Sequence, residues 1–383
     1  MARGLRIFLV VTAVALATWQ RARAIEGLHP DHDERPYIMA AFRYAERMAP
    51  GRWHEILDLE DNSEHPPLVK LAYAVAEKVT GAAEPGWNHV STYGKPMPAD
   101  ARAAFDAARW TSAVPGIAQV AIAALIHPLA GLVLAVEGYH AQYTAQAYLE
   151  GISGLFLLLA LLVFERGTRT GDGARRPDVD LRRVGAAFAL LGIAAAGKYP
   201  YGAVGLLTLA PLAILAIPRR PLAWLALGGI ALVAFVAFDP YLWPDPIGRA
   251  IHSVGFHLAY GQSKEVTSVG LPWYHQIVAL LHAGPMTERP GVFPFGWITP
   301  VVLPAALVGL PIAASRRPTW ALAAVIGLGF LLVWPVKWPQ YVLLVMAPLA
   351  ICAAHAPAMI AAAAQWLGRR IRSGRTATEP SPG

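Results

Sequence analysis

The chain has 383 residues, of which 56% are hydrophobic and only 15% charged, and its mean hydropathy is +0.42. Soluble domains carry roughly 25% charged residues, so this composition excludes a soluble globular protein. Apolar stretches long enough to cross a bilayer recur along the chain, which predicts an all-α, polytopic membrane protein. The single cysteine, Cys352, excludes a disulfide framework and a thiolate metal site.

The basic residues follow the pattern of membrane topology. The net charge is +7, but the arginines cluster in short segments between apolar runs, as in polytopic proteins. We therefore predict that the protein lies in a lipid bilayer and that its positive charge does not bind nucleic acid.

The first apolar run covers residues 7–19 and follows Arg3 and Arg6. Ala22, Arg23 and Ala24 come next and resemble a signal-peptidase site. We favour an uncleaved anchor because many spans follow, with cleavage as the alternative. About ten spans are predicted in all, and residues 129–139 are short enough to indicate a partial or broken helix. The spans after the first are residues 111–126, 129–139, 148–164, 184–197, 201–217, 222–238, 297–314, 320–334 and 341–354.

The basic clusters all fall on one face of the predicted bundle, which the positive-inside rule makes cytoplasmic. They are Arg3 with Arg6, residues 166–183, Arg219 with Arg220, Arg316 with Arg317, and a flexible basic tail over residues 369–383. Both termini are then cytoplasmic, in a bacterial inner membrane. Two long loops, residues 20–110 and 239–295, face the other side. We treat residues 1–383 as one domain, and no Walker or Rossmann glycine loop stands at a suitable place.

The loop 20–110 holds two acidic clusters, each ahead of a predicted helix. Residues 35–49 have apolar positions at spacings of three and four, which indicates a helix lying along the membrane surface, with Asp33 as a plausible N-cap. A second helix is predicted from Pro66 or Pro67 to Thr80. Helix capping explains Asp33, Glu34 and Glu64 equally well at this level, so the structural interpretation stays open beside a catalytic one.

Isolated cations stand near the outward ends of the predicted spans. They are Lys198, Arg249 and Lys337. Charged groups at membrane depth are often functional, although an interfacial anchor explains Lys337 and a solvated surface charge explains Arg249. Acids in the loop and cations at the bilayer edge together suit one task, which is to bind an anionic lipid phosphate while deprotonating a hydroxyl.

These residues carry a family resemblance. Asp33-Glu34 followed by Tyr37, then Gly-Arg-Trp at 51–53 and EHPPL at 64–68, resemble the first outer loop of the GT-C polyprenol-phosphate-sugar glycosyltransferases, which include protein O-mannosyltransferases and lipid A aminoarabinose transferases. GKYPYG at 197–202, DPYLWPDPIGR at 239–249 and KWPQYVLLVMAP at 337–348 resemble later segments of that family. The resemblance implies Asp33 and Glu64 as catalytic residues. It also implies substrate contacts at Glu34, Tyr37, His65, Lys198, Arg249, Lys337 and Tyr341.

The chain departs from the family pattern at two places. HAQYTAQAYLEG at 140–151 has Gln142 and Gln146 and no acid before Glu150, where the family often has His-Ala-Arg ending in Asp. Gln340 stands where an Arg often precedes the tyrosine. Both departures leave the sugar and the acceptor open, and a catalytically inactive assembly partner remains an alternative.

The resemblance implies a mannosyltransferase-like hexosyl transfer by inverting displacement from a polyprenyl-phosphate sugar to a protein, lipid or glycan hydroxyl. Asp33 would take the hydroxyl proton, Glu64 would orient a substrate, His65 would hold Glu64, and Lys198 with Arg249 or Lys337 would stabilise the leaving phosphate. No cofactor is required. A divalent metal at Asp31, His32 and Asp33 is conceivable chemically but not predicted. The rival class is a transporter or flippase of a lipid-linked anion, which usually shows related halves that we do not find here.

Overall fold

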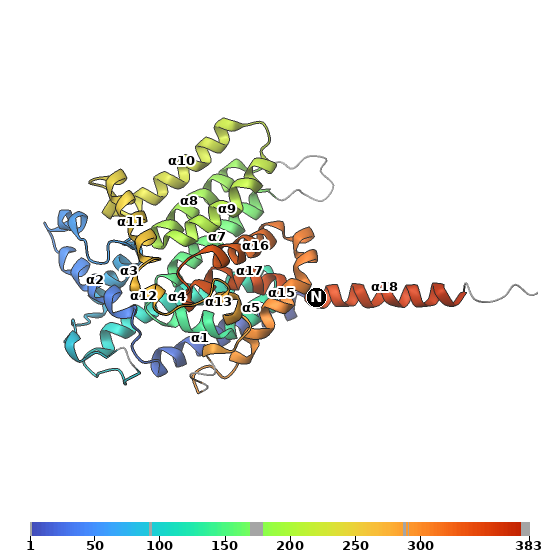
Figure 1. Cartoon of the computed structure of the whole chain (residues 1–383), viewed down its shortest axis with the longest axis horizontal. Coiled ribbons are helices and arrows are strands. Elements are labelled where there is room, and N and C mark those ends of the chain that lie inside the picture. Colours follow the sequence, from blue (N-terminus) through green and yellow to red (C-terminus); the bar gives the residue numbers. More distant parts are fainter. Residues whose placement is uncertain (1, 92–93, 169–178, 286–288, 290, 377–383) are drawn as a thin grey trace, which may run out of the picture.

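The structure is a computed structural model that describes residues 2–91, 94–168, 179–285, 289 and 291–376. The described part contains helices and turns and no β-strand. Figure 1 shows a helical bundle with smaller helices gathered at one end. The prediction of an all-α polytopic protein is confirmed.

Six segments are long and apolar enough to cross a membrane. They are α1 (Arg3–Gly27), α4 (Arg102–Ile126), α7 (Glu150–Thr168), α9 (Tyr199–Ala216), and the stretches Gly296–Arg316 and Pro339–Leu367. Two shorter apolar helices follow two of these segments in the chain: α10 (Pro221–Ala237) comes after α9, and α16 (Pro318–Val333) comes after Gly296–Arg316. The figure of about ten spans stays a prediction.

Two apolar stretches are interrupted. Residues 129–139 form no single helix, because α5 (Pro128–Val136) and α6 (Gly138–Ala145) are separated at Glu137. The Glu137 carboxylate accepts hydrogen bonds from the backbone nitrogens of Tyr139 and His140, so it caps α6. The last span divides into η5 (Pro339–Val342), α17 (Leu343–Ala353) and α18 (Ala356–Thr376).

Small residues let the bundle helices approach one another closely, as expected between helices in lipid. A Cβ on Gly192 of α8 (Leu181–Gly197) would lie 2.2 Å from the Ala231 carbonyl oxygen of α10. A Cβ on Gly309 of α15 (Thr299–Arg316) would lie 2.0 Å from the Cys352 carbonyl oxygen of α17. Helix α17 is buried along its whole length and forms the centre of the bundle.

One end of the bundle carries the helices of the two long loops (Figure 1). They are α2 (Glu34–Arg47), η1 (Trp53–Asp58), α3 (Leu68–Thr80), η2 (Trp87–His89), η3 (Pro240–Leu242), α11 (Pro246–Tyr260), α12 (Lys264–Thr267), α13 (His275–Ala279) and η4 (Gly296–Ile298). The predicted helices at 35–49 and 66–80 are confirmed. The apolar stripe of α2 is buried, and α2 packs on α3, so protein contacts hold this helix. Helix α1 extends to Gly27 and α4 begins at Arg102, so both helices reach into the segment predicted as the first loop.

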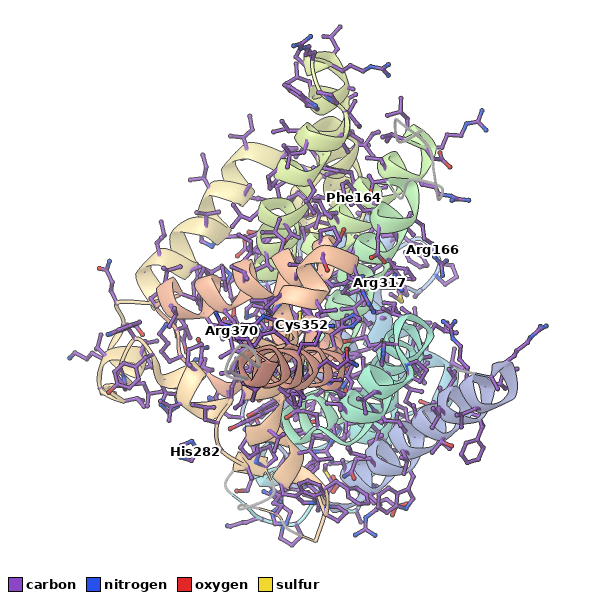
Figure 2. The ribbon with its side chains drawn as sticks, turned by 90° about the vertical axis from the view of Figure 1, so that its right-hand side faces the viewer. Phe164, Arg166, His282, Arg317, Cys352 and Arg370 are labelled. Atoms are coloured by element: carbon purple, nitrogen blue, oxygen red, sulfur yellow. The ribbon has the colours of Figure 1, made fainter. Side chains whose placement is uncertain are left out.

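The opposite end carries the amino terminus and α18, which projects away from the bundle. Figure 2 looks onto this end, where Arg166 and Arg317 lie near each other; Arg317 pairs with Glu165, the residue before Arg166, at 2.9 Å. The basic clusters at the ends of α7 and α15 therefore share one end of the bundle. Residues 369–376 of the predicted flexible tail continue α18, and residues 377–383 lie outside the described residues.

Candidate active site

Asp33 stands immediately before α2, but its side chain does not cap the helix. Its backbone is already helical (φ −79°, ψ −21°), and no capping hydrogen bond is formed. Instead, Asp33 Oδ2 accepts a hydrogen bond from Gln340 Nε2 at 3.0 Å. Burial, and then the neighbouring Asp31 carboxylate, raise the pKa of Asp33 to about 6. The structure thus provides a carboxylate turned away from its own helix, with the basicity that a proton acceptor needs near neutral pH.

A tight loop before α3 presents Glu64 and His65. Asn62 adopts a left-handed backbone conformation (φ 55°). The buried Lys70 ammonium then donates to the carbonyl oxygens of Asn62 and His65 at 2.6 and 2.8 Å. The Asn62 carbonyl oxygen also accepts from the His65 backbone nitrogen at 3.1 Å, so Lys70 adds further bonds to the turn itself. The loop geometry therefore depends on Lys70, a lysine between two apolar residues of α3 that the sequence interpretation did not select.

Two further contacts orient the ends of this loop. The Asn62 amide hydrogen-bonds the Glu64 carboxylate, and His257 of α11 contacts the Glu64 carbonyl oxygen at 2.9 Å. His65 lies edge-on to Tyr37, with ring centroids 5.7 Å apart. The prediction that His65 holds Glu64 is therefore wrong, since Asn62 does so. Burial, and then the charge of Lys198, lower the pKa of His65 well below its usual value, so the ring is neutral at physiological pH.

Lys198 joins α8 to α9 and is 2% exposed. Its ammonium group pairs with the carboxylate of Glu150 at the start of α7. It also lies 4.8 Å from the ring centroid of Tyr341, a distance suited to a cation–π interaction. A buried cation needs such a partner, and Glu150 supplies it. One Glu150 oxygen remains without a hydrogen-bond partner.

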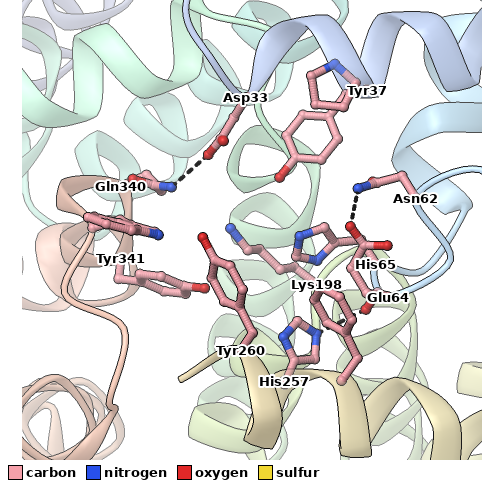
Figure 3. A pocket seen from close by; sticks show the side chains of 13 residues that line it. Asp33, Tyr37, Asn62, Glu64, His65, Lys198, His257, Tyr260, Gln340 and Tyr341 are labelled. Carbon is pink, nitrogen blue, oxygen red and sulfur yellow. Dashed lines mark hydrogen bonds between the residues drawn. The ribbon is translucent and has the colours of Figure 1, made fainter. Parts of the chain in front are cut away.

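These groups share one cavity of about 210 Å³ (Figure 3). It contains six of the nine predicted site residues, namely Asp33, Tyr37, Glu64, His65, Lys198 and Tyr341. Its other lining residues are Pro36, Asn62, Phe256, His257, Tyr260, Trp338 and Gln340. The cavity thus combines two acids, one buried lysine and several aromatic faces, in the manner of a site for a small polar ligand.

Comparisons with known proteins found structural relatives that cover most of this chain. No protein family model matches it, and no curated protein sequence does. Its structure is similar to that of ArnT from Cupriavidus metallidurans bound to undecaprenyl phosphate, with a TM-score of 0.60 and 16% identity over 93% of this chain and 60% of that chain. The apo structure of the same ArnT gives a TM-score of 0.57 with 16% identity, over 91% of this chain and 59% of that chain. The chain therefore shares the fold of ArnT, which is the GT-C fold. It spans about 60% of the length of ArnT.

Within this GT-C fold, the cavity lies where elements from the whole chain meet at one end of the bundle. Asp33 and Tyr37 come with α2, Glu64 with the loop before α3, and Lys198 with the α8–α9 turn. Helix α11 adds its aromatic face and η5 adds Gln340 and Tyr341. The α11 residues that line the cavity, Phe256, His257 and Tyr260, were not selected from the sequence. The amphipathic pattern of residues 246–260 could have indicated them.

Three predicted binding residues lie outside the cavity of the GT-C fold. Glu34 is fully buried and forms an ion pair with Arg109 at 2.7 Å. Arg249 donates to the carbonyl oxygens of Tyr241, at 2.8 Å, and Leu57, which joins α11 to the first loop. The Lys337 ammonium binds the carbonyl oxygens of Leu331 and Leu332 at 2.6 and 3.1 Å.

Each of these three side chains is occupied by a structural contact. Lys337 satisfies backbone acceptors that the end of α16 leaves free, as cations often do at helix carboxyl ends. None of the three lines the cavity in this structure, and Glu34 has a buried ion-pair partner, so their substrate contacts stay predictions.

The alternating Asp31, His32 and Asp33 do not form a metal cluster. The Asp31 carboxylate accepts from the Tyr148 hydroxyl and from the Asp33 backbone nitrogen. Over the described ranges, no group of three or more His, Cys, Asp or Glu side chains is arranged to hold a metal ion. Metal dependence stays an open prediction.

Proposed function

We propose that this protein is a membrane glycosyltransferase that moves a hexose from a polyprenyl-phosphate carrier to an extracytoplasmic acceptor hydroxyl with inversion. The observation that carries the proposal is the shared cavity of Asp33 and Lys198. Asp33 is a carboxylate poised to accept a proton, and Lys198 is a buried cation in the same space. The GT-C fold supports a lipid-linked sugar as the donor, as does the carrier lipid in the ArnT structure.

The reaction balances with these two groups. The acceptor oxygen attacks the anomeric carbon while its proton passes to Asp33. The bond from that carbon to the phosphate oxygen breaks, and its electron pair leaves with the phosphate. The carrier thus departs with one more negative charge, which Lys198 stabilises. Among the lining residues of the described chain, Lys198 is the cation available for this, because His65 and His257 have lowered pKa values.

Glu64 and the aromatic side chains have supporting roles in this scheme. The Glu64 carboxylate is held by the Asn62 amide, so it is pre-oriented to accept a hydrogen bond from a sugar or acceptor hydroxyl. Tyr37, Tyr260, Trp338 and Tyr341 line the remainder of the cavity. Such aromatic walls bind the apolar faces of a ring-shaped ligand while excluding water. A transporter of the same lipid would not need a proton acceptor at Asp33.

The decisive experiment measures donor cleavage. The protein, reconstituted in nanodiscs, is incubated with a panel of radiolabelled undecaprenyl-phosphate hexoses and a membrane extract as the source of acceptors, and released undecaprenyl phosphate is quantified. We expect cleavage by the wild type and a loss of about 10² or more in Asp33→Asn. Asn caps a helix about as well as Asp and the Asp33 side chain forms no cap, so thermal stability should be unchanged.

Glu60→Gln serves as the matched control. Glu60 is an exposed acid of the same loop and does not line the cavity. The control should retain wild-type cleavage. Movement of intact donor across a proteoliposome without cleavage would identify a transporter, and full turnover in Asp33→Asn would remove Asp33 as the base.

A further inference from the structure

The carboxamide of Gln340 links the two ends of the chain inside the cavity. Gln340 Nε2 donates to Asp33 Oδ2 at 3.0 Å across a separation of 307 positions. Figure 3 shows the contact as a dashed line, with the Asp33 carboxylate directed at the amide. Gln340 is 5% exposed and lies in η5, at the start of the last apolar stretch. A buried side-chain amide aimed at a carboxylate has a defined geometry, because its donor and acceptor sides are distinct.

Charged side chains also act on the Asp33 carboxylate. Asp31 and His32 precede it in the chain, Lys198 faces it from the α8–α9 turn, and Glu150 faces it from the start of α7. Tyr37 and Tyr341 flank the same space. In the described part of the chain, Gln340 is the side chain that donates a hydrogen bond to the Asp33 carboxylate.

We propose, resting on the transferase function above, that Gln340 is a positioning residue for Asp33, holding one carboxylate oxygen so that the other faces the acceptor hydroxyl. The amide fixes the rotation of the carboxylate without adding a charge beside it. A bare apolar neighbour would leave the carboxylate free to rotate, whereas a cation would hold it but make it a weaker base. Gln340 therefore orients the Asp33 carboxylate without lowering its basicity.

The charge of residue 340 is the property to vary. A cation within about 4–6 Å of a carboxylate lowers the carboxylate pKa by roughly 1–3 units. Gln340→Lys should therefore move the titration of Asp33 below pH 6 by at least about one unit. Gln340→Met removes the donor at nearly the same volume and adds no charge. It should lower kcat about tenfold to a hundredfold, since a misplaced catalytic group costs that order of rate, and should leave the donor KM unchanged.

The test combines kinetics with a readout that needs no turnover. The Asp33 carboxyl stretch is followed by infrared titration in nanodiscs and assigned by subtraction of Asp33→Asn. In parallel, the acid limb of kcat/KM is measured with the undecaprenyl-phosphate hexose that the wild type cleaves. Thermal unfolding verifies that each variant is folded.

Gln276→Met is the matched control. Gln276 is also a buried glutamine, and its amide binds the Trp338 carbonyl oxygen at 3.2 Å, in the turn that precedes Gln340. The Gln276→Met variant should loosen the same turn without contacting Asp33. It should therefore change neither the infrared titration of Asp33 nor the acid limb of kcat/KM. If Gln276→Met reproduces the loss seen in Gln340→Met, Gln340 acts only through the turn.

The two levels of the proposal fail separately. An active enzyme whose kcat is unchanged in Gln340→Met, or whose infrared titration is unchanged in Gln340→Lys, overturns the role of Gln340 alone. A wild type that cleaves no donor overturns the transferase function, whatever the infrared titration shows. A downward shift in Gln340→Lys together with the kcat loss in Gln340→Met supports the positioning role.

Discussion

Arg109 of α4 and Glu34 of α2 form a fully buried, two-point ion pair. Arg109 Nε and Nη2 donate to the two Glu34 oxygens at 2.8 and 2.7 Å, and both side chains have no exposed surface. Glu34 also accepts from the backbone nitrogens of Asp31 and Ala147. This carboxylate therefore ties the start of α2, and with it Asp33, to the bundle.

Removal of one partner of this pair should destabilise the protein strongly. Glu34→Ala leaves a buried guanidinium uncompensated, which costs about 3–5 kcal/mol. We expect a large fall in the unfolding temperature and loss of donor cleavage, measured by thermal unfolding in detergent. The double variant Glu34→Leu with Arg109→Leu leaves no unpaired charge and should recover part of the stability. The recovery is incomplete, because the backbone groups that bind Glu34 and Arg109 lose their partners. Equal stability of Glu34→Ala and wild type would show that the pair is dispensable.

Lys198 and Glu150 should affect carrier binding in opposite directions. Lys198→Met removes the cation and should weaken binding of labelled undecaprenyl phosphate tenfold or more, since phosphate contacts depend on charge-assisted hydrogen bonds. Glu150→Gln removes the carboxylate that shares the Lys198 ammonium, so it should tighten that binding several-fold. Equilibrium binding in nanodiscs measures both effects.

Lys337→Met is the control for these measurements. Its ammonium binds carbonyl oxygens at the end of α16, outside the cavity. This variant should bind the carrier as the wild type does and lose only stability. If Lys198→Met binds the carrier as tightly as the wild type does, Lys198 has only a structural role as the partner of Glu150.

Donor cleavage should lose activity on the acid side near pH 6. Asp33 accepts a proton only when ionised, and burial followed by the charge of Asp31 raises its pKa to about 6. Activity should therefore rise with pH through about 6, and at pH 5 about one tenth of the molecules hold an ionised Asp33. The pH profile of kcat/KM measures this. A limb near pH 4 would mean that the carboxylate is solvated like an ordinary surface acid.

The two ends of the bundle should face opposite sides of the membrane. Reporter fusions after residue 176, which lies outside the described residues, and after Arg317 should read cytoplasmic. Fusions near Asn88 and Ser263 should read extracytoplasmic, because α2, α3 and α11 gather at the other end from α18. A cytoplasmic signal at Asn88 would place the cavity on the wrong side for a lipid-linked donor.

Much of the fold was accessible from local sequence patterns. Apolar runs, capping signals and helix periodicity act over a few residues, so helices at 35–49 and 66–80 and a partial or broken helix at 129–139 were predicted from their own segments. The same patterns did not predict where the helices beside the first loop and the tail end. There, α1, α4 and α18 extend through polar residues that hydropathy assigns to loops.

The candidate site was only partly accessible in this way. The motifs around Asp33, Glu64 and Lys198 selected residues that do share the cavity. Glu150 and Gln340 were noticed only as departures from a family pattern, yet they are the direct partners of Lys198 and Asp33. Their partnerships join positions 48 and 307 residues apart, and no local pattern encodes such contacts.

The sequence by itself determined that this protein is a helical membrane protein with long acidic loops, because hydropathy, length and charge are properties of each segment alone. The tertiary structure decided which cation faces the acids. Lys198 and Lys337 both stand at span ends, but packing turns Lys337 toward backbone carbonyls and Lys198 toward Glu150 and the cavity. A flexible lysine binds whichever acceptors the surrounding helices place within its reach, and only the packed bundle sets those positions.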